Sequence, residues 1–215
     1  MIYCIGDSFT FGEELPSQDF AWPAVFSQLS GCEVINQGKP GTGNYRIVKR
    51  AMDAILNKSP EMIILGWTEP GRQEFADDVG IYDIWAGRNT KRIQTLPQSH
   101  RIDMIKYMTA YDCPEYYYAK WLRQIILIQA LCKTRNVKCL MFNACGCDQW
   151  NALYLKDHVD LFKQIDTNTY VGWPITGMAA WCHNHPKGPK NHPLEKGHAI
   201  TANKLYAYTR SLGWI

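Results

Sequence analysis

Ser8 is the first residue of this chain whose type and setting suggest chemistry. An apolar run from Met1 to Ile5 ends abruptly in Gly6-Asp7-Ser8. A short apolar run bounded by turn residues predicts a buried strand, and ligands of open α/β sheets collect beyond the carboxyl ends of such strands. Ser8 is therefore a candidate nucleophile, provided that a neighbouring group accepts the proton of its hydroxyl.

The residues around Ser8 also carry a family resemblance. Gly6-Asp7-Ser8, Thr10 and Gly12 follow the pattern Gly-Asp-Ser-x-Thr-x-Gly, and in this the chain resembles block I of the SGNH (GDSL-type) hydrolases. The resemblance implies an α/β fold and the hydrolysis of an ester through an acyl-serine intermediate. The alternative for the same residues is an Asp-Ser turn that caps a helix.

Two later segments resemble the blocks that complete the family's oxyanion hole. The glycine-rich loop 36–44 resembles block II, and by position Gly41 would offer its backbone N–H there. The alternative is a flexible loop that needs positive φ angles. Gly66-Trp67-Thr68-Glu69 stands where block III has Gly-x-Asn-Asp, so Thr68 replaces the asparagine and offers a hydroxyl of shorter reach. The resemblance thus implies an oxyanion hole of Ser8, Gly41 and Thr68.

The segment 191–198, Asn-His-Pro-Leu-Glu-Lys-Gly-His, resembles block V and implies that His192 is the catalytic base. That base must lie within hydrogen-bond reach of Ser8. Pro189 stands where the family has the third catalytic residue, an aspartate that fixes the imidazole tautomer; in trypsin its neutralisation costs about 10⁴ in rate. A backbone carbonyl could hold the ring instead, the protein could be a poor catalyst, or a distant acid could take part, such as Asp157, Asp160 or Asp166.

Trp67 and Arg72 follow the third expected strand, on the same rim as Ser8, and are candidate substrate-binding residues. Arg72 could clamp a carboxylate or phosphate of the substrate, and the alternative is an Arg-Glu pair that stiffens the loop. Aromatic residues farther along could stack on sugar rings or simply build the core. They are Tyr82, Trp85, Tyr107, Tyr111 and the run Tyr116 to Tyr118.

A competing set of side chains offers donors for zinc. The set comprises Cys145, Cys147, Cys182, His183 and His185. Its spacing matches no standard finger or ribbon, so core cysteines and surface histidines are the favoured interpretation. We expect no metal and no other cofactor.

Apolar periodicity predicts the elements that position these residues. Strands are expected at 1–5, 33–35, 62–66 and 137–142, and helices at 20–30, from about 44 to 55, at 116–134 and at about 194–208. We expect irregular structure between the end of the last strand, at 142, and about residue 192. We also expect an insertion with some helix of its own at 67–114. Alternating strands and helices predict a three-layer α/β/α sandwich of the flavodoxin-like type with a mostly parallel sheet, as a single domain over residues 1–215.

Composition excludes several classes of protein. A chain of 215 residues with 46% apolar content can build one full core. The 23 basic and 20 acidic residues leave a formal charge of +3, too slight for a nucleic-acid partner. No apolar run approaches the roughly 20 residues of a membrane span. Because no secretion signal is visible, we expect a cytoplasmic protein with reduced cysteines.

The blocks occur in the family's order and span residues 5 to 198. They imply a serine esterase that hydrolyses an acyl ester, such as an acetyl ester, on a carbohydrate or another small molecule. The altered positions Thr68 and Pro189 support an alternative, a binding or structural module that keeps the fold with weakened or lost catalysis. Departures of this kind resemble compact SGNH-like proteins of phage genomes.

Overall fold

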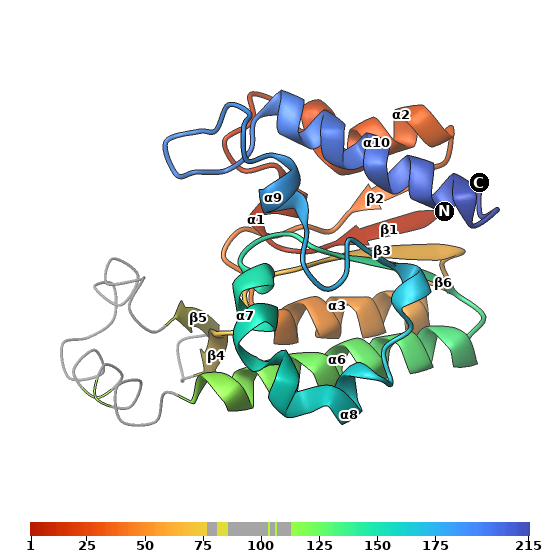
Figure 1. Ribbon diagram of the computed structural model, residues 1–215. Coiled ribbons are helices and arrows are strands. Elements are labelled where there is room, and N and C mark those ends of the chain that lie inside the picture. Colours follow the sequence, from red (N-terminus) through yellow and green to blue (C-terminus); the bar gives the residue numbers. More distant parts are fainter. Residues whose placement is uncertain (77–80, 86–102, 104–105, 107–112) are drawn as a thin grey trace.

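Five parallel strands form the central sheet of the computed structural model, which describes residues 1–76, 81–85, 103, 106 and 113–215 (Figure 1). The strands are β1 (Ile2–Ile5), β2 (Val34–Asn36), β3 (Met62–Trp67), β6 (Lys138–Asn143) and β7 (Tyr170–Val171). Their order is β2-β1-β3-β6-β7, and every neighbouring pair is parallel. The carboxyl ends of all five strands therefore meet at one edge of the sheet, as the sequence predicts for a mostly parallel sheet.

Helices cover both faces of this sheet (Figure 1). They are α2 (Trp22–Ser30) and α10 (Glu195–Ser211) on one face, and α3 (Asn44–Asn57) and α6 (Pro114–Thr134) on the other. Successive residues of β1 point to opposite faces, because side chains alternate along a strand. Tyr3 and Ile5 pack into the core beneath α3 and α6, whereas Ile2 and Cys4 pack into the core beneath α2 and α10. The three-layer α/β/α architecture is confirmed.

Local signals set the ends of the helices. Gly31 has a φ of 68° and ends α2, where Ser30-Gly31 predicts a stop. Pro114 lies in the first turn of α6, where its missing N–H costs nothing. The buried side chains of α6 recur every three or four positions, so one stripe of this helix faces the sheet. They are Tyr118, Ala119, Trp121, Leu122, Ile125, Ile128 and Cys132.

The connection between β6 and α10 is more structured than the sequence predicts. It contains α7 (Cys147–Tyr154), η2 (Leu155–His158), α8 (Val159–Phe162), η3 (Thr167–Thr169), the strand β7 and α9 (Met178–Trp181). The expectation of irregular structure here is wrong. These elements are too short to show a hydrophobic period, so the pattern of apolar residues does not reveal them.

The structure describes part of the expected insertion at 67–114. β4 (Arg72–Ala76) and β5 (Ile81–Trp85) pair antiparallel as a separate two-stranded hairpin beside the sheet (Figure 1). The helix expected in this segment, together with Tyr107 and Tyr111, lies outside the described residues. The described part of this segment is therefore a β-hairpin, which lies next to the carboxyl edge of the main sheet.

Two expectations from composition bear on the described residues. No helix in the described part of the chain is long and apolar enough to cross a bilayer. Cys4, Cys132 and Cys139 are buried free thiols and Cys32 is half-buried, which agrees with their interpretation as small hydrophobic residues of the core.

Candidate active site

Ser8 opens the short helix α1 (Ser8–Phe11), directly after β1. The carboxylate of Asp7 accepts a hydrogen bond from the Phe9 amide at 3.0 Å and caps this helix. Gly6 permits the tight turn, because a Cβ atom there would collide with the side chain of Thr10. The motif thus forms the helix cap of the alternative interpretation and still leaves Ser8 at the carboxyl end of a buried strand, as the nucleophile hypothesis requires.

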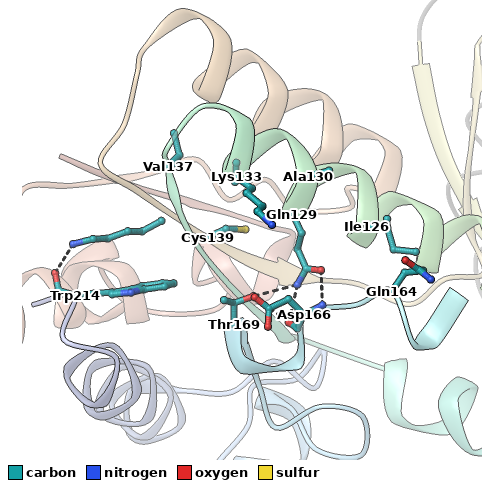
Figure 2. A pocket seen from close by; sticks show the side chains of 12 residues that line it. Ile126, Gln129, Ala130, Lys133, Val137, Cys139, Gln164, Asp166, Thr169 and Trp214 are labelled. Atoms are coloured by element: carbon teal, nitrogen blue, oxygen red, sulfur yellow. Dashed lines mark hydrogen bonds between the residues drawn. The ribbon is translucent and has the colours of Figure 1, made fainter.

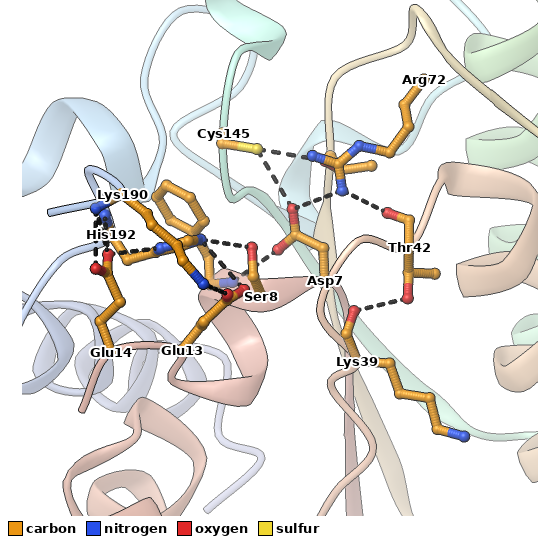
Figure 3. Close-up of polar contacts among 12 residues, drawn as sticks. Asp7, Ser8, Glu13, Glu14, Lys39, Thr42, Arg72, Cys145, Lys190 and His192 are labelled. Carbon is orange, nitrogen blue, oxygen red and sulfur yellow. Dashed lines mark hydrogen bonds and ion pairs between the residues drawn. The ribbon is translucent and has the colours of Figure 1, made fainter. Parts of the chain in front are cut away.

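His192 meets Ser8 from the opposite end of the chain. The Nε2 atom of His192 lies 2.9 Å from Oγ of Ser8 (Figure 3). The ring of Phe9 packs edge-on against the imidazole, with the ring centroids 5.4 Å apart. The Gly188 amide donates to the carbonyl of His192 at 2.9 Å and closes the loop that carries it. The structure therefore brings together the two residues that the sequence pairs as nucleophile and base.

Glu14 occupies the place of the missing acid. One carboxylate oxygen of Glu14, Oε2, lies 2.8 Å from Nδ1 of His192 (Figure 3). The same carboxylate accepts hydrogen bonds from the backbone amides of Lys190 at 2.9 Å and of His192 at 3.2 Å. None of the acids expected from the sequence fills this role: Asp157 and Asp160 lie in η2 and α8, and Asp166 caps η3. A signal for Glu14 exists in the sequence, namely an acid a few residues after Ser8. Because α1 is a single turn, the residues that follow it lie close to Ser8.

The proton positions follow from the partners of the ring. An ionised carboxylate only accepts hydrogen bonds, so Nδ1 of His192 carries a hydrogen and donates it to Glu14. Nε2 then offers a lone pair to the Ser8 hydroxyl. Burial raises the pKa of Glu14, but hydrogen bonds from the Lys190 amide and from the ring and amide of His192, with the charge of His192, outweigh it and leave this pKa below its usual value. Glu14 is thus ionised near neutral pH and can accept from Nδ1 of His192, which is the arrangement that the predicted general base requires.

The contact between Glu14 and the tail loop is tightly constrained. Glu14 has a φ of 73° and Asn191 a φ of 67°, both in the left-handed region that side chains disfavour. A Cβ atom on Gly188 would lie 2.6 Å from the carboxylate carbon of Glu14. Strained backbone at two positions and a close approach at a third are typical of sites where the surrounding structure over-determines the local geometry.

A second carboxylate lies on the other side of the imidazole. Oε2 of Glu13 is 3.6 Å from Nε2 of His192, and its Oε1 is 2.9 Å from Nζ of Lys190. Glu13 is more exposed than Glu14, and Lys190 is largely exposed. The ring of His192 is thus flanked by two acids, of which Glu14 makes the shorter contact.

Gly41 lies in the loop between β2 and α3, with a φ of 71°. This loop is bonded to β1 and the turn after it: the Gln37 amide donates to the Cys4 carbonyl at 2.7 Å, and the Lys39 amide to the Gly6 carbonyl at 3.1 Å. These bonds continue the pairing of β1 with β2 and hold the loop beside the turn that precedes Ser8. The positive φ of the alternative interpretation is present, and the role of the Gly41 amide in an oxyanion hole stays a prediction.

Thr68 is fully buried behind Ser8, and its backbone is held by the side chain of Asn44. Its Oγ1 lies 3.3 Å from Sγ of Cys145, and that thiol donates to Oδ2 of Asp7 at 3.4 Å. Burial and then the charge of Asp7 raise the pKa of Cys145 to about 12, so the thiol keeps its hydrogen. Because that hydrogen points to Asp7, the Thr68 hydroxyl donates to the sulfur. The hydrogen expected to face an oxyanion is therefore directed at Cys145.

Arg72 and Trp67 do not have the settings expected of substrate-binding residues. The guanidinium of Arg72 is buried; its Nη1 donates to the Thr42 carbonyl at 2.9 Å and lies 3.7 Å from Oδ2 of Asp7 (Figure 3). Glu74 lies 3.9 Å from Nε of Arg46. Trp67 ends β3 and is 0% exposed in the core beneath α3 and α6. Both side chains point into the protein because the strand end and hairpin that carry them are buried against the loop after β2.

Three of the proposed zinc donors have other partners. Cys145 bonds to Asp7, as described, and Sγ of the buried Cys182 lies 3.3 Å from the Gly197 carbonyl. The ring of His183 lies 2.9 Å from the Asn184 side chain, on the surface. Within the described ranges, no three metal-type side chains gather. The favoured interpretation of separate cysteines and surface histidines agrees with this arrangement.

The aromatic residues near the site divide between core and surface. Tyr118 is fully buried, and its hydroxyl donates to Oδ1 of Asn151 at 2.6 Å, whereas Tyr116 is 57% exposed. His198 of the Gly-His pair is also buried, and its Nδ1 accepts a hydrogen bond from the Trp22 amide at 3.0 Å. Tyr118 and His198 are therefore parts of the scaffold, since His198 links the first turns of α10 and α2.

A cavity of about 490 Å³ lies at the amino end of β6, away from Ser8 (Figure 2). Some of its polar side chains have partners within the protein. Gln129 bonds to Asp166 and Thr169, and Nζ of Lys138 donates to the Trp214 carbonyl at 3.1 Å. The residues that line this cavity do not include Ser8, His192 or Glu14, which lie at the opposite edge of the sheet.

No protein-family model and no curated protein sequence matches this chain. Solved structures match it in fold. The psychrotrophic esterase EstA from Pseudoalteromonas sp. aligns with a TM-score of 0.56 at 11% identity, covering 98% of this chain and 97% of that one. A member of the lipolytic G-D-S-L family from Veillonella parvula gives 0.53 at 14% identity, covering 97% and 98%. A carbohydrate esterase family 2 enzyme from Corynascus thermopiles gives 0.56 at 16% identity, covering 99% of this chain and 66% of that one. The chain has the fold of the SGNH (GDSL-type) hydrolases, as its motifs predict.

Proposed function

We propose that this protein is a serine hydrolase of esters, with Ser8 as the nucleophile, His192 as the general base and Glu14 as the acid that orients it. One observation carries the proposal: hydrogen bonds of 2.8 and 2.9 Å link Glu14, His192 and Ser8 in line at the carboxyl end of β1. This is the relation of nucleophile, base and orienting acid that defines the triad on unrelated folds.

The reaction follows from these contacts. Nε2 of His192 takes the hydroxyl proton as Oγ of Ser8 attacks the ester carbonyl, and the imidazolium that forms is stabilised by Glu14. The same proton then passes to the alkoxide leaving group, which departs as an alcohol and leaves an acyl-serine. A water molecule repeats the sequence with His192 as base, and the acid is released. The backbone amides of Ser8 and Gly41 are the proposed donors to the oxyanion.

The substrate class is proposed from the structural neighbours. The Pseudoalteromonas esterase was solved with monoethylphosphonate as inhibitor. Another match is a two-domain esterase active on acetylated mannans, with a TM-score of 0.50 at 14% identity. These neighbours, with the Corynascus enzyme, support an acyl ester, and in particular an acetyl ester of a carbohydrate, as the substrate here.

The alternative is a module that keeps the fold and has lost catalysis. The direction of the Thr68 hydroxyl toward Cys145 favours it, since one oxyanion donor is then missing. Glu14 argues against it, because a carboxylate is present beside His192 although Pro189 replaces the expected aspartate. Loss of a single oxyanion donor lowers kcat about 10²- to 10³-fold and leaves a functional triad, so weakened hydrolysis is the stronger proposal.

Hydrolysis of p-nitrophenyl acetate and butyrate tests the proposal, together with labelling by a fluorophosphonate probe. The parent protein should turn over at least one ester and take up the probe, and Ser8→Ala should do neither. Ser211→Ala, which alters an exposed serine at the end of α10, is the matched control and should behave as the parent. A parent protein without turnover or label would contradict the proposal, as would full activity of Ser8→Ala.

A further inference from the structure

Arg72 joins the two backbone segments that the proposed oxyanion hole requires. Its side chain is 5% exposed, and Nη1 donates to the Thr42 carbonyl at 2.9 Å while lying 3.7 Å from Oδ2 of Asp7. Thr42 directly follows Gly41 in the loop after β2, and Asp7 directly precedes Ser8. Figure 3 shows the guanidinium between these two partners. One rigid cation therefore touches the immediate neighbours of both proposed amide donors.

The loop on the Thr42 side is stiffened at the same place. The Thr42 hydroxyl donates to the Lys39 carbonyl at 2.6 Å, and the Lys39 amide donates to the Gly6 carbonyl at 3.1 Å. Gly41 lies between these anchors with a left-handed backbone. The bond from Arg72 to Thr42 therefore bears directly on where the Gly41 amide points.

The chemistry makes that orientation important. Because the Thr68 hydroxyl donates to Cys145, the proposed oxyanion hole depends on backbone amides alone. An oxyanion hole accelerates the reaction only when its donors are held at hydrogen-bond distance from the developing charge. A displacement of about 1 Å can cost roughly 10²-fold in rate.

We propose that Arg72 is the positioning residue of the oxyanion hole: it holds the loop that carries Gly41 in fixed register with the turn that carries Ser8. This inference rests on the esterase function proposed above. It differs from both interpretations drawn from the sequence, the substrate clamp and the Arg-Glu pair. A planar guanidinium with several donors can serve a carbonyl and a carboxylate together, whereas a lysine ammonium is a point charge on a flexible stem.

The first test is Arg72→Lys, which keeps the charge beside Asp7 and removes the planar fork. We expect kcat for p-nitrophenyl esters to fall about tenfold to a hundredfold, with KM within about threefold, because the substrate still binds while the oxyanion donor is displaced. Arg46→Lys is the matched control. Arg46 lies near Glu74, outside the proposed machinery, and its variant should keep the parent kcat.

The second test is chemical rescue, which a general loss of folding would not show. In Arg72→Ala, added guanidinium at concentrations well below denaturing ones should restore part of kcat, and methylammonium should restore less. Thermal unfolding of each variant, followed by circular dichroism, gives the fraction that is folded at the assay temperature. If Arg72→Ala does not fold, Arg72→Lys alone decides the question.

The outcomes separate this inference from the function on which it rests. If the parent hydrolyses esters and Arg72→Lys keeps its kcat, the inference is wrong and the esterase proposal stands. A loss in Arg72→Lys that is fully explained by unfolded protein, or that falls on KM alone, also overturns it. If the parent has neither turnover nor fluorophosphonate label, the proposed function is wrong and this inference falls with it.

Discussion

Glu14 and Ser8 contact opposite nitrogens of one imidazole: Glu14 lies 2.8 Å from Nδ1 of His192 and Ser8 lies 2.9 Å from Nε2. Both come from the segment directly after β1, Ser8 from the helical turn α1 and Glu14 from just beyond its end, so the proposed triad needs only one long-range approach, that of the loop carrying His192. The loop is held by the same carboxylate, through the amides of Lys190 and His192. The Glu14 carboxylate thus both orients the imidazole of the proposed base and attaches the loop that carries it.

Substitution of Glu14 tests the place of the acid. Glu14→Gln keeps the size of the side chain but removes the charge that fixes the Nδ1 hydrogen and stabilises the imidazolium. We expect kcat for p-nitrophenyl acetate to fall by about 10² to 10⁴. Asp157→Asn, at one of the acids proposed from the sequence alone, should keep the parent rate. Equal rates for Glu14→Gln and the parent would remove Glu14 from the mechanism.

The close approach of Gly188 to Glu14 predicts a specific coupling between two positions. Gly188→Ala would place a methyl group 2.6 Å from the Glu14 carboxylate carbon, so we expect lower activity and a loss of about 1–3 kcal/mol in unfolding free energy. In the Glu14→Ala background the obstacle is gone, and the added alanine should cost much less. A double-mutant cycle measured by urea unfolding gives the coupling. Additive losses would show that the methyl group and the carboxylate do not meet.

His198 predicts a pH dependence of stability. Burial lowers its pKa to about 4, partly opposed by a hydrogen bond with the Pro193 backbone, while the unfolded chain should titrate near 6.5. Between these values the unfolded chain takes up a proton that the folded protein refuses, so the free energy of unfolding should decrease as the pH falls from about 6.5 to about 4. With about 1.4 kcal/mol for each pKa unit, this contribution is about 3 kcal/mol.

The matching variant is His198→Asn, whose side-chain oxygen can still accept from the Trp22 amide. Its unfolding free energy should vary less between pH 6.5 and 4.5 than that of the parent. His183→Asn, at a surface histidine, should retain the parent slope. Urea unfolding at a series of pH values measures both, and an unchanged slope in His198→Asn would refute the assignment.

Thr68→Val tests the direction of the Thr68 hydroxyl. Because that hydroxyl donates to Cys145, its removal should leave kcat within about fivefold of the parent and lower stability by about 1 kcal/mol. An oxyanion donor would behave differently, since its loss costs about 10²-fold or more in kcat. Comparison of kcat with the unfolding midpoint separates the two roles, and a hundredfold fall in kcat would restore Thr68 to the oxyanion hole.

Apolar periodicity was sufficient to predict the strands that carry the site, because β1, β3 and β6 are buried runs that end at turn residues. The pairing of Ser8 with His192 followed from motif resemblance. Glu14 was not among the acids that the sequence suggests, Asp157, Asp160 and Asp166, because a single helical turn and a left-handed backbone bring it to His192, and the residue pattern does not reveal that path. Trp67 and Arg72 are buried although they lie at the rim, because rim position says nothing about which way a side chain points, and their roles in substrate binding stay predictions.

The short elements between β6 and α10 show another limit. β7 has two residues, and no alternation can be recognised over so short a run. Its position is decided by pairing with β6, a long-range contact that local sequence does not encode. The network of Asp7, Cys145 and Thr68 is similar, since it joins the ends of three strands and becomes visible only when the sheet is assembled.

A carboxylate borne on the same segment as the proposed nucleophile frees the tail from supplying one. The tail then has to contribute only an imidazole and two main-chain amides, and position 189 can accept proline without disabling the site. Sequences with this arrangement are not found by a motif that requires an acidic residue three positions before the C-terminal histidine. A glutamate placed shortly after the Gly-Asp-Ser turn, behind a glycine that ends the first helical turn, is the pattern by which such chains can be found.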